Sequence, residues 1–269
     1  MRYFILFCYG LLLSIPLSAA EYNNKNCQMC VMDFRNNEQS VISNSNYTGS
    51  IFKDSNLSQS QITNTNLSST NFVDSYLNNV EFENVLFTNA NLSFASFRKS
   101  NFQNTDFISA FMHSINFELS SFNEAFFNNA EMSFLKGMEA SFDNSNFSFA
   151  DLEMADLEYA QFNYSKFNNT VFNSSNLKYA TFKNSDLTRA YFRSIHGADI
   201  VFEDSVLSAA DFQGSDLRFA TFKNTILSKV NFSGANLKYA SFDNVIGFTS
   251  ANFCNATMPD GTVKTCPTE

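Results

Sequence analysis

The sequence has few of the residues on which catalytic and cofactor sites depend. Its 269 residues include no tryptophan, three prolines, eight glycines and only two histidines, His113 and His196. Both histidines stand in ordinary repeat surroundings, and no glycine-rich loop of the kind that holds phosphate occurs. Carboxylates recur at regular intervals along the chain and do not gather at one point. We therefore predict that the protein is not an enzyme and holds no metal or cofactor.

Positive charge is scarce as well. Lys and Arg number 17 against 26 Asp and Glu, which gives a formal net charge of -9 at pH 7. Such a surface is repelled by nucleic acid and by anionic membrane, so we expect no direct binding to either. The few prolines and glycines indicate turns that are built by one repeated rule rather than as individual loops.

Long apolar runs are absent after Leu17. Arg2 precedes an apolar stretch over residues 3–17, and small residues fill 18–20, as in a secretory signal peptide. A membrane anchor is the alternative, but about 15 apolar residues fall short of the roughly 20 that span a bilayer. We predict that residues 1–20 are a signal peptide, that the mature chain enters no membrane, and that the protein is exported to the periplasm or outside the cell.

Phenylalanine, by contrast, is abundant, with 33 residues placed at a fixed interval. From Ile42 to Phe242 every fifth residue is Phe, Leu, Ile, Met or Tyr, except at Gly137 and Gly197. Two residues before each of these centres stands Ser, Thr, Ala, Val or Ile, with Leu135 as the one bulky exception. Neither the period of a helix nor that of a strand keeps such a pattern on one face. The chain must therefore coil, with each pentad adding one large and one small side chain to a shared interior.

The length of one coil follows from where identical residues recur. When every fourth centre is read, nine successive centres are Phe, whereas reading every second centre meets Leu and Met residues that break the run. The nine are Phe82, Phe102, Phe122, Phe142, Phe162, Phe182, Phe202, Phe222 and Phe242. Another column at the same spacing contains both Gly137 and Gly197. One coil is therefore four pentads, and we expect Leu135 and Ile195 to fill the volume that the two glycines leave.

Several pentads carry a recognisable signature. They are Ala150-Asp151-Leu152, Ala155-Asp156-Leu157, Ser185-Asp186-Leu187, Ser215-Asp216-Leu217 and Ala235-Asn236-Leu237. These runs resemble the A-[DN]-L-x-x pattern of the pentapeptide-repeat family, and the resemblance covers about four fifths of the chain. It implies an all-β fold, a right-handed four-sided parallel β-helix, in agreement with the coil of four pentads found from the columns.

No cysteine occurs between Cys30 and Cys254, which limits what the cysteines can do. About eleven coils at the roughly 4.8 Å spacing of paired strands put the two ends on the order of 50 Å apart, too far for one disulfide or one zinc ion. In an oxidising compartment we expect one disulfide at each end, joining Cys27 to Cys30 and Cys254 to Cys266. A redox-active Cys27–Cys30 pair is the alternative, although no βαβ pattern adjoins it.

The pattern also divides the chain into segments. We predict an N-terminal capping segment over 21–31, the β-helix over 32–248 and a C-terminal cap with a turn over 249–269. Caps are expected because exposed strand edges at the ends of a stack invite aggregation. Asn37 departs from the pattern and predicts a frayed start, whereas Phe253 arrives one residue late and marks the end of the repeat.

Positions two residues after each centre should face solvent, and they too form columns when every fourth pentad is read. One column, from Asn44 to Asn244, is mostly Asn and favours a ladder of stacked amides with a structural role. Another column contains four aromatic residues with Asp199 between the two pairs. The four are Tyr159, Tyr179, Phe219 and Tyr239.

This aromatic column has two interpretations. Rings on successive coils stabilise a wall by stacking on one another. Alternatively, an exposed aromatic strip flanked by Lys178, Arg218 and Lys238 binds a protein partner or a second copy of the chain, because Tyr and Phe on a rigid frame lose little entropy on binding.

Two functions are consistent with the sequence. The first is an exported structural or interaction scaffold that presents the walls of a rigid β-helix to a protein partner, whose identity the sequence does not give. The second comes from the family resemblance, which implies an acidic rod that mimics DNA and binds a DNA-binding protein such as a type II topoisomerase. The signal peptide and the cations beside the aromatic column argue against the second.

Overall fold

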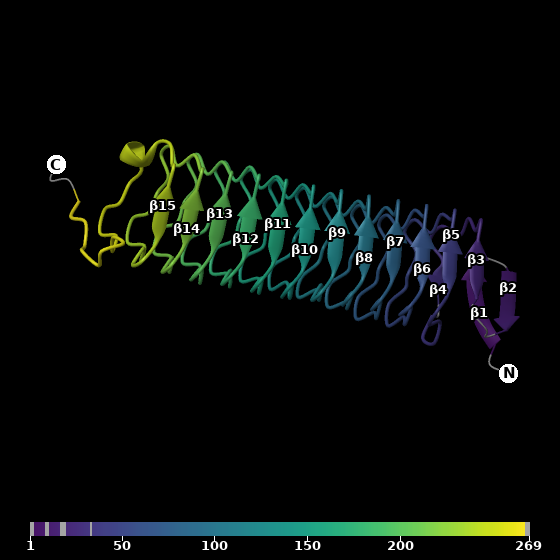
Figure 1. Cartoon of the computed structure of the whole chain (residues 1–269). Helices are drawn as coiled ribbons and strands as arrows, with labels where there is room; N and C mark the ends of the chain where they lie inside the picture. Colours follow the sequence, from purple (N-terminus) through teal and green to yellow (C-terminus); the bar gives the residue numbers. More distant parts are fainter. Residues whose placement is uncertain (1–2, 9–10, 17–19, 33, 267–269) are drawn as a thin grey trace.

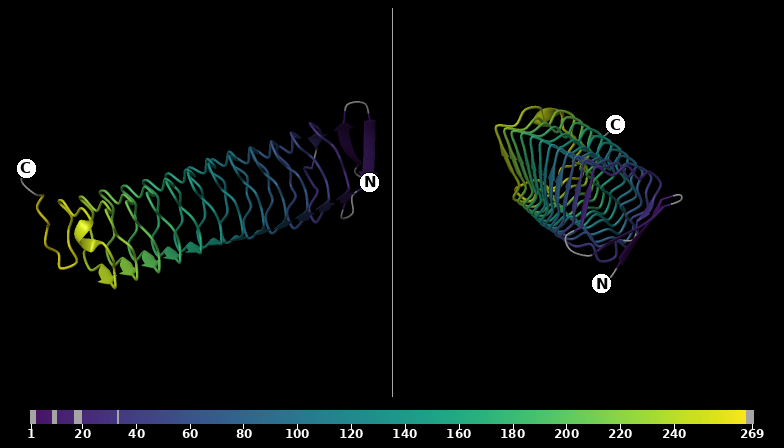
Figure 2. Two further views of the ribbon diagram at one scale, coloured as in Figure 1. Left: turned by 90° about the horizontal axis from the view of Figure 1, so that it is seen from above. Right: turned by 90° about the vertical axis from the view of Figure 1, so that its right-hand side faces the viewer.

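The computed structural model describes residues 3–8, 11–16, 20–32 and 34–266. The chain winds into a long rod with its two termini at opposite ends (Figure 1). It is an all-β, right-handed, four-sided parallel β-helix, as the sequence predicts. Seen nearly along the axis, successive coils lie over one another as a stack of frames (Figure 2).

One wall of the rod carries a sheet of twelve parallel strands, which we call the strand wall. Its strands are β3 (Glu21–Asn23), β5 (Val41–Ser43), β6 (Gln61–Thr63), β7 (Glu81–Glu83), β8 (Asn101–Gln103), β9 (Ser121–Asn123), β10 (Ser141–Asp143), β11 (Gln161–Asn163), β12 (Thr181–Lys183), β13 (Val201–Glu203), β14 (Thr221–Lys223) and β15 (Ser241–Asp243). A second, antiparallel sheet at the N-terminal end has the order β2-β1-β4. It consists of β1 (Tyr3–Cys8), β2 (Leu11–Pro16) and β4 (Val31–Met32).

Residues that pair between successive coils are four pentads apart throughout the regular part of the rod. On the strand wall Phe142 pairs with Phe122 on one side and with Phe162 on the other. The other walls are joined by isolated parallel bridges at the same separation, such as Asp151 to Val171. The coil length predicted from the phenylalanine column is thus confirmed.

The interior is filled by the pentad centres, which are almost completely buried. Along the strand wall the rings stack coil upon coil, with centroids 4.7 Å apart between Phe122 and Phe142 and 5.2 Å apart between Phe142 and Phe162. Rings on the neighbouring wall meet them edge-on, as Phe147 meets Phe142 at 79°. Both arrangements are favourable for aromatic pairs and supply stabilisation beyond the burial of apolar area.

The two glycine centres are explained by packing rather than by backbone conformation. A Cβ on Gly137 would lie 2.9 Å from Cδ2 of Leu157, with Leu135 also in contact, and a Cβ on Gly197 would lie 3.0 Å from Cδ1 of Ile195. Leu135 and Ile195 are buried. Ile195 occupies the space of the missing centre at Gly197, as the sequence predicts, whereas at Gly137 Leu135 shares the space with Leu157 of the next coil.

The corners between walls depend on a left-handed residue two positions after each centre. Non-glycine residues at these positions have φ between 48° at Asn64 and 66° at Tyr239. Asn tolerates this conformation better than most residues, which accounts for the asparagine column. Its amides form the predicted ladder in part, since Asn104 donates to Asn84 and Asn84 donates to Asn64.

At the corner that follows a strand, the N–H of the small residue is not bonded to the carbonyl of the preceding centre, so a side chain must accept its hydrogen bond. At the other corners the N–H of the small residue bonds to the preceding centre, as Ala150 does to the Phe147 carbonyl at 2.9 Å. After several of the strands, the hydroxyl of the next coil accepts that N–H instead. Ser145 N–H donates to Ser165 Oγ at 3.0 Å, and the pattern continues through Ser185 to Ser205. The sequence indicated only small residues at these sites, whereas in the structure hydroxyls act as acceptors at several of them, and Val85 and Ala125 stand at others.

The first coil begins earlier than the sequence predicts. The pattern predicts a capping segment over 21–31 ahead of the β-helix, but β3 is the first strand of the strand wall, because Tyr22 occupies a centre and is buried. The predicted frayed start at Asn37 is also wrong. Its side chain is buried and donates to Tyr22 Oη at 2.6 Å, and its N–H bonds to Asn56 O, so the coil closes there.

Each end of the rod carries one of the expected cysteine pairs as a disulfide. Cys27 and Cys30 are bonded within the first coil, with Cα atoms 5.7 Å apart, and both are buried. At the other end a single helical turn, η1 (Phe248–Ser250), absorbs the extra residue, so that Asn231 bridges to Asn252.

Beyond η1 the chain folds back on itself. Thr257 and Val263 form an antiparallel bridge, and the Pro259-Asp260-Gly261 turn joins them, with Gly261 N–H donating to Met258 O. Cys254 and Cys266 close this hairpin, with Cα atoms 4.4 Å apart.

Two predicted boundaries stay predictions. The signal-peptide cleavage point follows residues 17–19, which lie outside the described residues, as do the last three residues, 267–269, of the predicted C-terminal cap. Across the described ranges, no helix has the length and apolar character needed to cross a bilayer.

Replacing Phe142 with Ala should lower the free energy of unfolding by about 3–5 kcal/mol, because the rings above and below hold the cavity open. The outward Asn144→Asp change in the same coil should cost less than about 1 kcal/mol. Urea unfolding of both variants measures the difference. Equal losses would show that the inside and outside positions are assigned wrongly.

Ser165→Ala should lower the free energy of unfolding by roughly 1–3 kcal/mol, because it leaves the Ser145 N–H buried without an acceptor. Ser175→Ala is the matched control. Ser175 is also buried, but among the described residues its hydroxyl has no partner, and its N–H bonds to Phe172 O. This control should be neutral or slightly stabilising in the same unfolding experiment. A neutral Ser165→Ala would contradict the role given to the hydroxyl ladder.

Candidate functional site

The four predicted partner-binding residues lie together on one corner of the rod. Tyr159, Tyr179, Phe219 and Tyr239, here called the aromatic strip, each stand two residues before a strand of the strand wall. Tyr159 and Tyr179 stack with centroids 4.7 Å apart, and Phe219 and Tyr239 stack with centroids 5.0 Å apart. The four side chains are between 44 % and 57 % exposed. Stacking therefore leaves about half of each ring accessible.

The backbone at these positions is poorly suited to aromatic residues. All four have left-handed φ, from 58° at Tyr179 to 66° at Tyr239. Bulky side chains are rare in this conformation, which costs an L-residue roughly 1–2 kcal/mol. On another corner the chain meets the same requirement with Asn84 and Asn104, whose amides also stabilise the stack. Other bulky residues, such as Leu119 and Met154, have the same φ at their corners, so this conformation belongs to the corners in general.

The predicted flanking cations differ in their surroundings. Lys238 places Nζ 4.9 Å from the centre of the Tyr239 ring. Arg218 is held by the Asp216 carboxylate, with Nε to Oδ1 at 2.8 Å and Nη2 to Oδ2 at 2.7 Å. The Arg218 hydrogen bonds lower the pKa of Asp216. Lys178 lies in the same column of the sequence, and its backbone N–H donates a hydrogen bond to Asn176 Oδ1.

Acidic side chains surround the pair formed by Tyr159 and Tyr179. The pKa of the Tyr159 phenol is raised, first by loss of hydration beside its neighbours and then by Tyr179 and Glu158. Glu139 and Asp199, in the same column, act on this pKa in the same direction. The Tyr159 phenol thus remains a protonated hydrogen-bond donor at neutral pH.

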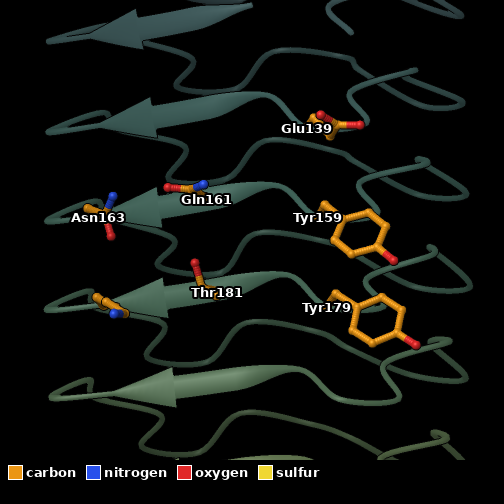
Figure 3. A pocket seen from close by; sticks show the side chains of 7 residues that line it. Glu139, Tyr159, Gln161, Asn163, Tyr179 and Thr181 are labelled. Carbon is orange, nitrogen blue, oxygen red and sulfur yellow. The ribbon is translucent and has the colours of Figure 1, made fainter. Parts of the chain in front are cut away.

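Beside the tyrosine pair a shallow groove of about 800 Å³ runs over the strand wall (Figure 3). Figure 3 shows the two tyrosines and Glu139 along one edge and the polar side chains of β11 and β12 along the floor. The lining residues are Glu139, Tyr159, Gln161, Asn163, Tyr179, Thr181 and Lys183. Of these, the sequence prediction included only the tyrosines, because the floor residues vary from coil to coil and form no uniform column.

Sequence reasoning missed other exposed aromatic residues. Phe94 and Phe134 occupy left-handed positions on a different corner, two coils apart, and the His113 ring lies between them. Phe149 and Tyr164 are exposed in the same backbone conformation elsewhere. Reading every outward column coil by coil would have found Phe94 and Phe134.

Within the described part of the chain, no group of three or more His, Cys, Asp or Glu residues is arranged to hold a metal ion. His113 lies on the surface, with Nδ1 3.0 Å from Ser133 Oγ. The aromatic strip and its groove can bind a partner by stacking, hydrogen bonding and charge.

A double-mutant cycle on Phe219→Asn and Tyr239→Asn should give a coupling of about 0.5–1.5 kcal/mol, because the two rings are in contact. The matched cycle on Tyr179→Asn and Phe219→Asn should give a coupling near zero, since these rings are two coils apart with the coil of Asp199 between them. Denaturant unfolding of the single and double variants measures both. Equal couplings would contradict the division of the strip into two pairs.

Comparison with protein families agrees with the observed fold. A model of pentapeptide repeats matches residues 38–74, 65–104, 155–193 and 215–246 in eight copies, slightly more than half of the chain. None of the curated proteins compared matches this sequence.

Among solved structures, HetL, a pentapeptide repeat protein involved in heterocyst differentiation regulation from the cyanobacterium Nostoc sp. strain PCC 7120, is 21% identical. The match covers 90% of this chain and 93% of HetL, with a TM-score of 0.42. QnrB1, a plasmid-mediated fluoroquinolone resistance protein, is 15% identical over 86% of this chain and 96% of its own, with a TM-score of 0.43. A pentapeptide repeat protein from the thylakoid lumen of Arabidopsis thaliana is 24% identical over 35% of this chain and 66% of its own, with a TM-score of 0.34. From the family match and the observed fold, the chain belongs to the pentapeptide-repeat family.

Proposed function

We propose that this protein is an exported, non-enzymatic scaffold that binds a protein partner through the aromatic strip and the groove beside it. The observation that carries the proposal is the placement of four half-exposed aromatic rings at left-handed corner positions. Aromatic residues on a rigid support are the residues most often responsible for binding energy in protein interfaces. The β-helix supplies such a support, because the coils on either side fix the backbone of each corner.

The cysteine pairs support export. A disulfide persists in an oxidising compartment and is rare in the cytosol. The structure contains two, Cys27 with Cys30 and Cys254 with Cys266. The N-terminal sequence over residues 1–20 adds the features of a signal peptide.

The DNA-mimic alternative has less support from the charge pattern. A mimic of DNA needs rows of unpaired carboxylates to replace phosphates. On the strand wall from β12 to β15 the acids and bases instead alternate, since Glu203 lies 3.3 Å from Lys183 and 2.7 Å from Lys223. The cations Lys178 and Arg218 lie beside the strip as well.

Replacing all four strip residues with Asn should remove partner binding. Asn suits the left-handed backbone, so the change deletes the rings and keeps the corners. The matched control replaces Phe94, Phe134, Phe149 and Tyr164 with Asn, four rings of similar exposure and conformation on other corners.

Both variants and the unchanged protein are compared by quantitative capture of proteins from the exported fraction and by sedimentation velocity. Loss of one specific protein, or of a dimer, in the strip variant alone is the expected result. Equal capture and equal oligomeric state for the strip variant and the unchanged protein would refute the proposal.

A further inference from the structure

The aromatic strip is interrupted at one coil, where the corner position carries an acid in place of a ring. Asp199 occupies the corner position between Tyr179 and Phe219, with left-handed φ of 61° like its neighbours in the column. The two residues before it are small, Gly197 and Ala198. We call this position the Asp199 step.

The two rings that border the step have one face without an aromatic neighbour. Tyr179 stacks on Tyr159 through one face, and Phe219 stacks on Tyr239 through one face. Their other faces look along the rod axis toward the coil of Asp199. Because the two rings are two coils apart, they lie on the order of 10 Å from each other. A planar group midway would lie about 5 Å from each ring, which is close to the stacking distances already found in the strip and within the range of cation–π attraction.

The carboxylate at the step is available for a ligand. No hydrogen bond or ion pair joins the Asp199 side chain to another described residue, and the residue is half-buried. Arg218, whose charge is attracted to Asp199 and whose pKa Asp199 helps to raise, is directed to Asp216 by two hydrogen bonds. Asp199 therefore keeps its acceptor oxygens for a group that arrives from outside.

The chain itself shows what such a position accepts. On another corner Phe94 and Phe134 are also two coils apart, and the corner between them carries Ser114. There the space is taken by the ring of His113, the residue just before Ser114, with centroids 5.5 Å from Phe94 and 5.1 Å from Phe134. A planar, nitrogen-bearing group thus fits between two rings at this spacing, although the His113 ring meets them edge-on, at 72° and 65°, rather than stacked. At the Asp199 step the equivalent residue is Ala198, which is too short to fill the position.

We infer that the Asp199 step is a binding site for the guanidinium group of an arginine side chain on the partner protein. The group stacks between Tyr179 and Phe219 and donates hydrogen bonds to the Asp199 carboxylate. This inference rests on the proposed function of the strip, and it specifies the chemistry of one contact.

Arginine fits the step better than lysine for two reasons. Its guanidinium is planar and stacks on aromatic faces, and its fork of donors matches a carboxylate. An ammonium is compact and strongly hydrated, and it matches neither the two rings nor the paired oxygens. The acidic surface, with a formal net charge of -9, favours the approach of a basic partner. Lys178 and Arg218, next to the rings, repel a basic partner locally, but Asp216 neutralises the charge of Arg218.

Titration of the purified protein with small probes tests the inference. The probes are N-acetyl-arginine amide, N-acetyl-lysine amide and N-acetyl-citrulline amide, the last being planar like arginine but uncharged. Binding is followed by NMR of the Phe and Tyr ring protons. The arginine probe should shift the Tyr179 and Phe219 signals and bind about tenfold or more tightly than citrulline, because only the charged form pairs with the carboxylate. Equal shifts with all three probes would overturn the inference.

Three variants locate the site. Asp199→Asn should reduce binding of the arginine probe about tenfold, and Ala198→His should block it by filling the step as His113 does on the other corner. Asp204→Asn is the matched control, because Asp204 is an exposed acid with the same left-handed backbone on a different corner. Unchanged arginine binding in Asp199→Asn, or an equal loss in Asp204→Asn, would contradict the assignment.

Partner capture separates this inference from the proposed function. If the quadruple strip variant loses the partner while Asp199→Asn keeps it with unchanged affinity, the strip binds a partner but the arginine site is wrong. If the arginine probe binds at Asp199 and the quadruple strip variant still captures every partner, the site stands and the proposed function fails.

Discussion

The structure depends on one geometric constraint, the return of the chain to the same point after every four pentads. Only then does the N–H of one coil meet the carbonyl of the next, as Leu152 N–H meets Val171 O at 2.7 Å. Two features of each pentad maintain the constraint. An apolar centre fixes the interior width, and a left-handed residue two positions later turns the corner. A rod with exposed side chains on every corner follows directly.

The same constraint determines what the exposed residues are free to do. Because backbone hydrogen bonds and buried rings hold the frame, corner positions need only tolerate a positive φ. Asn meets this need at low cost, and its amide adds a hydrogen bond between coils. An aromatic residue at such a position adds strain and solvent-exposed apolar area. This exposed apolar area is the basis of the binding role proposed for the aromatic strip.

Much of this architecture is predictable from the sequence because the repeat makes each column visible. The coil length follows from the column of Phe, and the filling of Gly197 by Ile195 follows from volume alone. Tyr22 is in phase with the later centres, but the closure of the first coil at Asn37 depends on its hydrogen bond to Tyr22, which leaves no periodic signal. The hydroxyl ladder through Ser165 was hidden because Ser and Ala are equally small. The groove floor at Gln161 depends on neighbours that only the folded coils bring together.

The frame of coils, and not the aromatic strip, holds the fold together. The most direct measurement of this is the urea unfolding midpoint of the protein in which all four strip residues are Asn, next to that of the unchanged protein. We expect an equal or higher midpoint, because relief of strain at the left-handed corners offsets the lost stacking. A large fall in the midpoint, comparable with that caused by removing a buried ring, would contradict this account of the fold.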